Sequence, residues 1–439
     1  MSNSFIKNTI MTLTRQISGI LLGLLASIII ARSLGPEGNG LYQLIVLLPT
    51  TLMTLLNFGV GTSSVYYVGK NKYEVKDIIK TNTASGIVLS LVSIIIGFVV
   101  VMFFSDKFFA GVPQDYLYII LMIMPLLMLN EFYLVIFQGV QDFKSYNSLA
   151  LLRQLAALIS LVLFIFILQI GLAGTVIAFT IGVITQFAVT LFLFKKSLKT
   201  NLLAGNISKD YFKDSFSFGF KAHFSNVLSF INYRADIYLI SMFLNPASVG
   251  LYGVAVSIAE RLWIVSQSIS SVLYPVISSS NDIESKNKLT SIISRNVLFF
   301  SILGGIVFYF VSDLIFRILF GAAYDESSDI LKMLLPGIIL FSVDRILSND
   351  LAGRGKPELN MYTSIFTVVS NIILNFVLIP KIGIAGAAVS TSVTYSLSTI
   401  IKIVLYKRET GVAYSKLVLL QKEDIALFKQ LINKAVKRK

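Results

Sequence analysis

Charged side chains lie inside two neighbouring apolar stretches of this sequence, and their types suit the recognition of an anion and the movement of an ion. Arg234 and Asp236 interrupt one stretch, and Glu260 and Arg261 interrupt the next. If these stretches cross a bilayer, each ionisable group at the centre costs about 2.5–3.5 kcal/mol on insertion scales, so its presence needs a reason. A guanidinium group matches the geometry of phosphate oxygens, whereas a carboxylate can accept a proton or a small cation.

The spacing of these residues predicts that they lie at one depth. Arg234 is nine residues before the end of its stretch at Phe243, and Glu260 is ten residues after Gly250, near the start of the next. At about 1.5 Å per residue, both side chains lie roughly 15 Å from the same surface, close to the midplane. We therefore expect either an Arg234–Glu260 pair or an Asp236–Arg261 pair across the hairpin.

Other embedded charges complete the candidate set. Arg15 lies about one turn inside the first apolar stretch, and Asp344 and Arg345 are adjacent in a later one. The basic residues are expected to bind substrate; they are Arg15, Lys221, Arg234, Arg261 and Arg345. The acidic residues are expected to couple an ion; they are Asp236, Glu260 and Asp344. The alternative role is helix association or, for Arg15, a reach to the lipid headgroups.

The elements that position these charges must be membrane-spanning helices. Hydrophobic residues make up 55% of the 439 residues and charged residues only 14%, with a mean hydropathy of +0.79. Runs such as GIVLSLVSIIIGFVVVMFF reach the length of about 20 apolar residues that crosses a bilayer core. These runs are continuous rather than alternating, so they predict helices and not the strands of a barrel. The fold class expected is an all-α polytopic membrane protein.

Polar and Gly/Pro-rich clusters divide the chain into twelve expected transmembrane helices. The spans are 10–31, 41–67, 82–104, 116–138, 149–169, 172–194, 217–243, 249–275, 297–320, 330–352, 361–379 and 384–406. Lysines and arginines concentrate in alternate loops, which are therefore expected on the cytoplasmic side. An even number of spans then places both termini in the cytoplasm. The expected location is the cytoplasmic membrane.

An internal repeat predicts two pseudo-symmetric lobes of six helices around a central cavity. The stretch ARSLGPEGNGLYQL shares its Gly-Leu-Tyr triplet with SMFLNPASVGLYGV 210 residues later, and GLAGTVIA resembles GIAGAAVS 212 residues later. We expect an N-terminal lobe at 1–196, a cytoplasmic linker at 197–216 and a C-terminal lobe at 217–406. Transporters with parallel repeats of this kind bind substrate between their halves.

Polar residues recur at helical spacing inside several spans. In the eleventh span they repeat at every fourth position, as Thr363, Thr367, Asn371 and Asn375. Such a face is expected to line a wet cavity, with helix–helix association as the alternative.

The net charge of +14 does not predict nucleic-acid binding, because the excess lies in expected cytoplasmic loops and in the tail. Residues 407–439 are expected to form a basic amphipathic tail on anionic lipid, with apolar positions at Ile425, Phe428, Leu431, Ile432 and Ala435. The chain has no cysteine and one histidine, His223. We therefore predict no metal site, cofactor or catalytic residue.

Three motifs resemble a known family. ARSLGPEGNGLYQL, LFGAAYDESSDILKMLLPG and GIAGAAVSTS are similar to the polysaccharide-transport branch, or Wzx-type oligosaccharide flippase group, of the multidrug/oligosaccharidyl-lipid/polysaccharide exporter superfamily. The resemblance covers roughly residues 5–406. It implies two six-helix lobes around a cationic cavity and transfer of undecaprenyl-diphosphate-linked oligosaccharide units between leaflets, for cell-surface polysaccharide synthesis. It implies no fixed set of ligands, so the candidate residues rest on depth and charge alone.

Other functions stay open at this point. A multidrug/cation antiporter and a peptidoglycan-precursor lipid flippase share the superfamily, and a lipid scramblase would show no dependence on an ion gradient. A glycan polymerase or ligase is disfavoured because it needs a long outer loop for catalysis. The expected partners are a polyprenyl-diphosphate-linked oligosaccharide, membrane lipids and other polysaccharide-assembly proteins, with H⁺ or Na⁺ as candidate coupling ions.

Overall fold

A computed structural model of the chain describes residues 3–202, 204–280 and 282–424, and no β-strand occurs in these ranges. Contacts between residues divide the chain into two compact units. Unit 1 is Met1–Phe230 with Leu244–Gly250, and unit 2 is Ile231–Phe243 with Leu251–Lys439. The expected all-helical class is confirmed.

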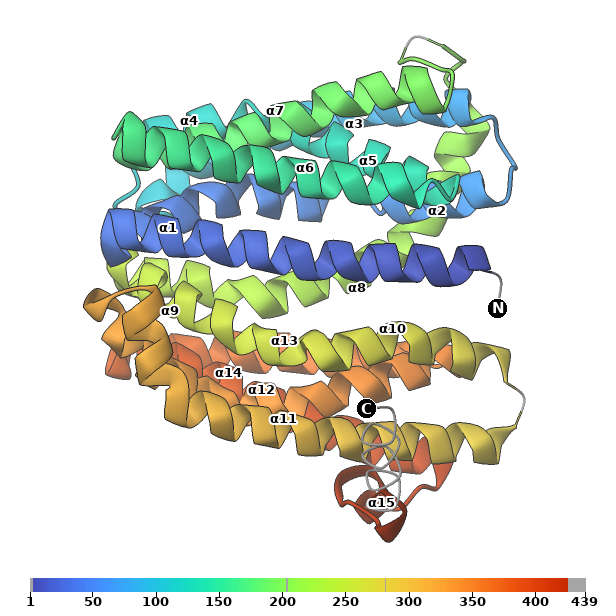
Figure 1. The fold of residues 1–439 in the computed structure, drawn as a ribbon, viewed down its shortest axis with the longest axis vertical. Helices are drawn as coiled ribbons and strands as arrows, with labels where there is room; N and C mark the ends of the chain where they lie inside the picture. The colour runs from blue at the N-terminus through green and yellow to red at the C-terminus, as the bar shows by residue number, and fades with distance from the viewer. Residues whose placement is uncertain (1–2, 203, 281, 425–439) are drawn as a thin grey trace, which may run out of the picture. The chain divides into compact units, whose positions relative to one another are not determined.

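Unit 1 is a bundle of long helices joined by short connections (Figure 1). Its elements are α1 (Asn3–Leu56), α2 (Val60–Gly69), α3 (Val75–Phe108), α4 (Gln114–Leu121), α5 (Met124–Gly139), α6 (Phe143–Val162), the π-helical turn η1 (Leu163–Ile167), α7 (Gly171–Ser197) and the first part of α8 (Lys209–Phe243). Helix α6 packs against α7 and α1, and α5 packs against α2 and α3.

Unit 2 is built around α12, which packs against α10, α11 and α14. Its elements are the rest of α8, most of α9 (Pro246–Ala259), the 3₁₀ turns η2 (Glu260–Leu262) and η3 (Ala322–Tyr324), α10 (Trp263–Ser279), α11 (Ile283–Leu319), α12 (Asp325–Gly353), α13 (Pro357–Ile382), α14 (Ile384–Thr410) and α15 (Tyr414–Val418). Small and apolar residues on α12, among them Gly337, Ile338 and Leu347, are buried at these contacts.

Within the described ranges, eight helices are long and apolar enough to cross a membrane, or nine if the bent pair of α4 and α5 is one span. The number is below twelve partly because α1 is counted once, although its apolar part runs over 43 residues. That length corresponds to about 65 Å of helix, roughly twice a bilayer core. Helices α8 and α12 are outside the eight, since charged residues lower their hydropathy. The number of twelve spans stays a prediction.

The break between the first two expected spans lies where the sequence predicts it. Gly35 adopts φ 66° and ψ −176°, so the helical geometry of α1 is interrupted there. Only glycine adopts such a positive φ at little cost. A second break, which the sequence analysis did not predict, separates α1 from α2 at Asn57–Gly59. Gly59 has φ 71°, and its N–H donates to Asn57 Oδ1 at 2.9 Å.

The two copies of the Gly-Leu-Tyr repeat meet in unit 1 through their glycines. A Cβ atom on Gly40 would lie 1.7 Å from the carbonyl oxygen of Pro246, and one on Gly250 would lie 2.0 Å from that of Pro36. No side chain fits at either glycine without moving the backbone of a neighbouring segment. The tight turns therefore bring two segments into direct backbone contact.

The first part of α8 is attached to α2 and α3 by polar contacts. Tyr211 Oη donates to Asn82 Oδ1 at 3.0 Å, and Ser215 hydrogen-bonds Ser63. At the exposed end, Asp214 accepts hydrogen bonds from Lys72 Nζ and Tyr73 Oη, each at 2.6 Å. Hydrogen bonds from Lys72 and then Tyr73 lower the pKa of Asp214. Further along α8, the ring nitrogens of His223 lie 3.0 and 3.1 Å from Asn57 Oδ1 and the carbonyl oxygen of Leu55. These contacts attach the first part of α8 to unit 1.

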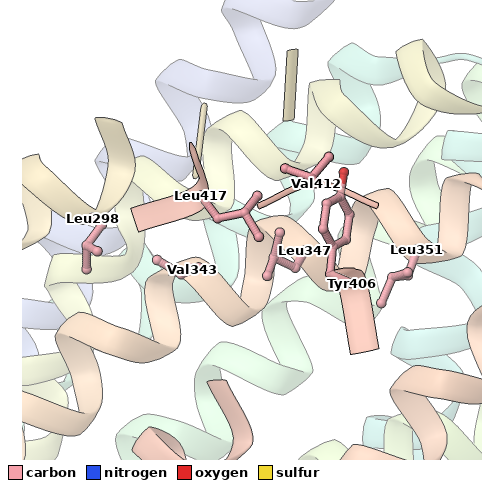
Figure 2. Close-up of a cluster of buried hydrophobic side chains, with 7 residues drawn as sticks. All are labelled: Leu298, Val343, Leu347, Leu351, Tyr406, Val412 and Leu417. Carbon is pink, nitrogen blue, oxygen red and sulfur yellow. The ribbon is translucent and has the colours of Figure 1, made fainter. Parts of the chain in front are cut away.

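The chain after α14 folds back onto unit 2, and we call residues 411–424 the C-terminal segment. Leu417 and Val412 pack against Leu347 of α12 and Tyr406 of α14, in a buried cluster with Leu298, Val343 and Leu351 (Figure 2). The segment is also held by charge: Arg295 of α11 donates from Nε and Nη2 to Asp424 at 2.5 and 2.9 Å. The apolar positions predicted for the tail, from Ile425 onward, lie outside the described residues.

Candidate functional site

The central part of the candidate site is a break between α9 and α10 in unit 2. The chain changes from α-helix to the 3₁₀ turn Glu260–Leu262 and then back to α-helix at Trp263. A short 3₁₀ stretch inside a long helix often marks a functional position. Trp263 fixes the break because its indole Nε1–H donates to the carbonyl oxygen of Ile338 on α12 at 2.9 Å.

The expected pairing of Arg234 with Glu260 is confirmed. Arg234 Nη1 lies 3.9 Å from Glu260 Oε1, and the two side chains are 37% and 28% exposed. This separation is at the outer limit of an ion pair, so neither group is strongly held by the other. Most of the five N–H donors of Arg234 therefore remain available to a ligand.

Three guanidinium groups act electrostatically on the carboxylate of Glu260. Arg234, Arg345 and Arg261 each interact electrostatically with it. Arg261 makes only a long hydrogen bond to Ser257 Oγ, at 3.4 Å, and its Nε has no hydrogen-bond partner among the described residues. Asp236 also interacts electrostatically with Glu260. Two carboxylates cannot balance three guanidinium groups, so the cluster carries excess positive charge that suits an anion.

Arg345 is held in place by aromatic rings. Its guanidinium carbon lies 4.2 Å from the ring centre of Trp263, and its Nη2 donates to Tyr233 Oη at 3.0 Å. Stacking of this kind orients a guanidinium group without neutralising it. Nε of Arg345 has no hydrogen-bond partner in the described part of the chain.

Asp236 does not pair with Arg261; it is only 4% exposed and binds hydroxyl groups instead. Its Oδ2 accepts from Tyr252 Oη and from Thr391 Oγ1 at 3.0 Å. Asn371 Nδ2 lies 3.4 Å from the same threonine hydroxyl. The result is an oxygen-rich group of side chains around one buried carboxylate, the donor type that hard cations prefer. Within the described ranges, no three His, Cys, Asp or Glu residues group into a metal site.

Asp344 belongs to a separate buried network. It accepts hydrogen bonds from Ser348 and Ser398, each at 3.0 Å, and interacts electrostatically with Lys402 of α14. Lys402 is 1% exposed and donates to Asn360 Oδ1 at 2.7 Å. The sequence analysis missed Lys402. The signal was present, since it is the one lysine inside the last apolar stretch, four residues before the expected end at 406.

Two of the eight candidates belong to unit 1 rather than to this cluster. The guanidinium carbon of Arg15 lies 5.2 Å from the ring centre of Tyr146 on α6, and the side chain is half-buried. Lys221 lies on α8, and its side chain is outside the described part of the structure. The cluster in unit 2 therefore consists of Arg234, Arg261 and Arg345 with Glu260.

The expectation of a wet cavity is wrong for the polar residues of α13. Thr363, Thr367, Asn371 and Asn375 are all buried. Asn371 faces Thr391 and Thr394 of α14, and Asn375 Nδ2 donates to Asn371 Oδ1 at 2.9 Å. The hydroxyl groups of Thr363 and Thr367 donate to carbonyl oxygens of α13 itself. Asn371 is thus the residue of this face that joins α13 to α14.

The fold defines the class of protein. A solved structure of the lipid II flippase MurJ in an inward closed conformation superposes with a TM-score of 0.75, at 20% identity over 92% of this chain and 87% of that chain. An inward-facing multidrug resistance MATE family transporter gives a TM-score of 0.72, at 14% identity over 90% of this chain and 94% of that chain. The protein is a multi-pass membrane protein with a MATE/MurJ-like transporter fold.

The family follows from the sequence comparison. A family profile described as polysaccharide biosynthesis protein matches residues 5–281, and a MatE profile matches residues 222–377. The chain belongs to the polysaccharide biosynthesis protein family of the multidrug/oligosaccharidyl-lipid/polysaccharide exporter superfamily. This is a transporter family and not an enzyme family, and the resemblance inferred from the motifs is confirmed.

The names of similar proteins also refer to flippases and transporters of glycans. The probable low-salt glycan biosynthesis flippase Agl15 of Haloferax volcanii is 29% identical over 207 residues, which is 45% of this chain and 43% of that protein. The putative O-antigen transporter of Shigella flexneri is 23% identical over 426 residues, which is 93% of this chain and 99% of that protein. The match to Agl15 thus spans less than half of that relative, whereas the match to the O-antigen transporter spans nearly all of it.

Proposed function

We propose that this protein translocates undecaprenyl-diphosphate-linked oligosaccharide units from the inner to the outer leaflet of the cytoplasmic membrane by alternating access, for cell-surface polysaccharide synthesis. Family membership supports an oligosaccharide flippase-like transporter. The polyprenyl diphosphate carrier is the finer part of the proposal, and it rests on the chemistry of the site.

One observation carries the choice of substrate. Arg234, Arg261 and Arg345 present partly unpaired guanidinium groups inside apolar helices, and they outnumber the two carboxylates with them, Glu260 and Asp236. Such charges are costly in a membrane. A diphosphate offers several oxygens to planar guanidinium donors and so compensates this cost. Its outward movement is also favoured by an inside-negative potential, by about 2.3 kcal/mol per elementary charge per 100 mV.

The acidic residues are proposed to couple transport to an ion. Asp236 has one oxygen, Oδ1, without a hydrogen-bond partner among the described residues, and hydroxyl and amide groups surround it. Protonation or Na⁺ binding there would change the charge of α8, two residues from Arg234. Glu260 and Asp344 are the other proposed coupling residues, and Arg15 and Lys221 are proposed to contact substrate from unit 1.

The architecture proposed for transport is that of twelve spans in two six-helix lobes, at 1–196 and 217–406, with a linker at 197–216. Both termini are proposed to be cytoplasmic. The basic tail at 407–439 is proposed to be cytoplasmic and attracted to anionic lipid, although residues 411–424 of it pack against unit 2. Other polysaccharide-assembly proteins are proposed as partners.

Substitution of the arginines tests the proposal. Arg234→Ala and Arg261→Ala are expected to abolish surface glycan export in a strain that lacks its own flippase, and to accumulate the lipid-linked intermediate in the cytoplasmic leaflet. Arg317→Ala is a matched control, because Arg317 is an exposed arginine in the last turn of α11. Membrane insertion of each variant is checked by membrane fractionation. Normal export by both site variants would refute the role of the arginines.

The MatE match at 222–377 and the MurJ-like fold favour two alternatives. A multidrug/cation antiporter would lower the accumulation of cationic dyes in intact cells. A peptidoglycan-precursor flippase would restore growth after depletion of the resident lipid II flippase. Either result, without glycan export, would replace the proposed function.

A further inference from the structure

Unit 1 contains a polar cavity of about 520 Å³ that none of the roles above uses. Three helix faces form it: Thr62 and Tyr66 come from α2, Glu131 and Gln138 from α5, and Asn226 from the first part of α8. Glu131 and Gln138 are seven residues apart and so lie on one face of α5. The volume is in the range of small-molecule sites.

The polar side chains of this cavity have free hydrogen-bonding capacity. The side chains of Thr62, Glu131, Gln138 and Asn226 line the cavity, and none has a hydrogen-bond partner among the described residues. Glu131 interacts electrostatically with Arg153 of α6 but forms no ion pair within the described ranges. Thr62, Glu131 and Asn226 are exposed and Gln138 is half-buried, so these four polar groups are open to a ligand that enters the cavity.

The chemistry of the lining excludes a phosphate and favours a neutral ligand rich in hydroxyl groups. Glu131 is the one charged side chain that lines the cavity, and its negative charge repels an anion. A carboxylate accepts hydrogen bonds, a hydroxyl both donates and accepts, and a carboxamide does each through a different atom. Sugar hydroxyl groups require this mixture of donors and acceptors.

An aromatic wall completes the resemblance to a saccharide site. The rings of Tyr66 and Phe218 stack at 4.4 Å, and each ring stays partly exposed. The carbon-bound hydrogens of a sugar ring can pack against such a surface. An organic cation is disfavoured there, because the ammonium group of Lys70 already lies 4.7 Å from the ring centre of Tyr66.

We propose that this cavity binds the glycan portion of the lipid-linked substrate, with Glu131, Thr62, Gln138 and Asn226 as hydrogen-bonding residues. The proposal rests on the proposed flippase function and adds a site that distinguishes substrates by their sugars. In this cavity of unit 1 the sugars are bound by uncharged groups and one carboxylate.

Reconstitution in proteoliposomes tests the proposal with two defined lipids. One is undecaprenyl diphosphate with a single N-acetylglucosamine, and the other carries a tetrasaccharide that begins with the same sugar. Thr62→Val, Asn226→Leu and Glu131→Gln are compared with Ser229→Ala, a control for an exposed hydroxyl of α8 outside the cavity. Loss of one hydrogen bond is expected to slow the tetrasaccharide lipid about ten- to a hundredfold, with little change for the monosaccharide lipid.

The outcomes separate this inference from the proposed function. Arg234→Ala should slow the transport of both lipids. Normal transport of both lipids by Thr62→Val would show that the fold is intact and would overturn the glycan site. Equal slowing of both lipids by the cavity variants would also overturn it. A loss of ion dependence in Glu131→Gln, with unchanged preference between the lipids, would identify a cation site instead. If the wild-type protein moves neither lipid, both proposals fail together.

Discussion

Asp424→Ala is expected to release the C-terminal segment from unit 2. Arg295 and Asp424 are 4% and 1% exposed, and Nε and Nη2 of Arg295 donate to the two carboxylate oxygens at 2.5 and 2.9 Å. Asn296 Nδ2 adds a hydrogen bond at 3.1 Å, and the backbone N–H of Gln421 adds another at 2.7 Å. The substitution removes the acceptor of all four bonds.

The size of the effect follows from burial. Removal of one partner of a buried ion pair costs about 3–5 kcal/mol, because the other charge remains buried without compensation. Each 1.4 kcal/mol is a factor of ten in an equilibrium constant. The population of the detached segment should therefore increase by about two to three and a half orders of magnitude. Packing of Leu417 in the cluster of Figure 2 opposes release and limits its extent. The long helices of unit 2 also pack against one another, so they should stay folded.

Hydrogen exchange measured by mass spectrometry is the suitable assay. Peptides that cover 411–424 should lose protection in Asp424→Ala, while peptides from α12 should not. The control is Asp313→Ala, which removes a second ion pair of unit 2. Asp313 lies 2.7 Å from Lys332 Nζ, but its side chain is 72% exposed, so the expected cost is below about 1 kcal/mol.

Two results would refute this reasoning. The first is protection of 411–424 in Asp424→Ala that equals that of the wild-type protein. The second is a loss of protection at 411–424 in Asp313→Ala that equals the loss in Asp424→Ala. Burial would then not explain why the Arg295–Asp424 pair is the stronger of the two. The double variant Arg295→Met with Asp424→Leu is expected to recover protection, since a buried ion pair replaced by apolar groups is often neutral in stability.

Three further predictions concern stability. Gly40→Ala should lower the melting temperature, with an expected cost of about 1–3 kcal/mol or more from overpacking. Gly23→Ala is the control, because no atom lies within 4 Å of the added Cβ. Equal melting temperatures of the two variants in thermal unfolding would contradict the close backbone contact at Gly40. Asn360→Ala should destabilise the protein by about 1.5–3 kcal/mol in thermal unfolding, because it leaves the buried ammonium group of Lys402 without its acceptor. Adding Lys402→Met to this variant should restore most of the lost stability. Burial raises the pKa of Asp424, but hydrogen bonds from Arg295, the Gln421 N–H and Asn296 outweigh it and lower the pKa. Hydrogen-exchange protection of 411–424, corrected for intrinsic exchange rates, should therefore be constant from about pH 5 to 8. It should fall below about pH 4, as Asp424 becomes protonated.

Hydropathy located the helices but not all their ends. Each of the twelve expected stretches coincides with a helix or a pair of helices, and the break at Gly35 was predicted from its Gly-Pro sequence. By contrast, α8 begins at Lys209 and not at 217, and α11 begins at Ile283 and not at 297. Polar helical extensions beyond the membrane carry no apolar signal, so hydropathy alone could not place these ends. The break at Asn57–Gly59 was hidden inside an apolar run.

Depth arguments predicted which charges approach each other, but not their hydrogen-bond partners. The rise per residue along a helix was enough to predict that Arg234 lies near Glu260. It could not assign Asp236 to Tyr252 and Thr391, because a search limited to charges does not consider hydroxyl groups. The burial of the polar face of α13 depends on how α13 meets α14, which periodicity does not determine.

The cavity of unit 1 could not be predicted from local sequence at all. Thr62, Glu131 and Asn226 come from three helices that are distant along the chain. Glu131 was noticeable as an embedded charge, but its uncharged neighbours look ordinary in the sequence. Free hydrogen-bonding capacity becomes visible only when the helices are in place.

The ion pair of Arg295 and Asp424 also orders events during biosynthesis. The two residues are 129 positions apart. At a translation rate of about 5–20 residues per second, Asp424 is therefore synthesised roughly 6–26 s after Arg295. A prematurely terminated chain never receives that counter-ion and keeps an uncompensated guanidinium group on α11. A product truncated before Asp424 thus carries a defect that cellular proteases can recognise.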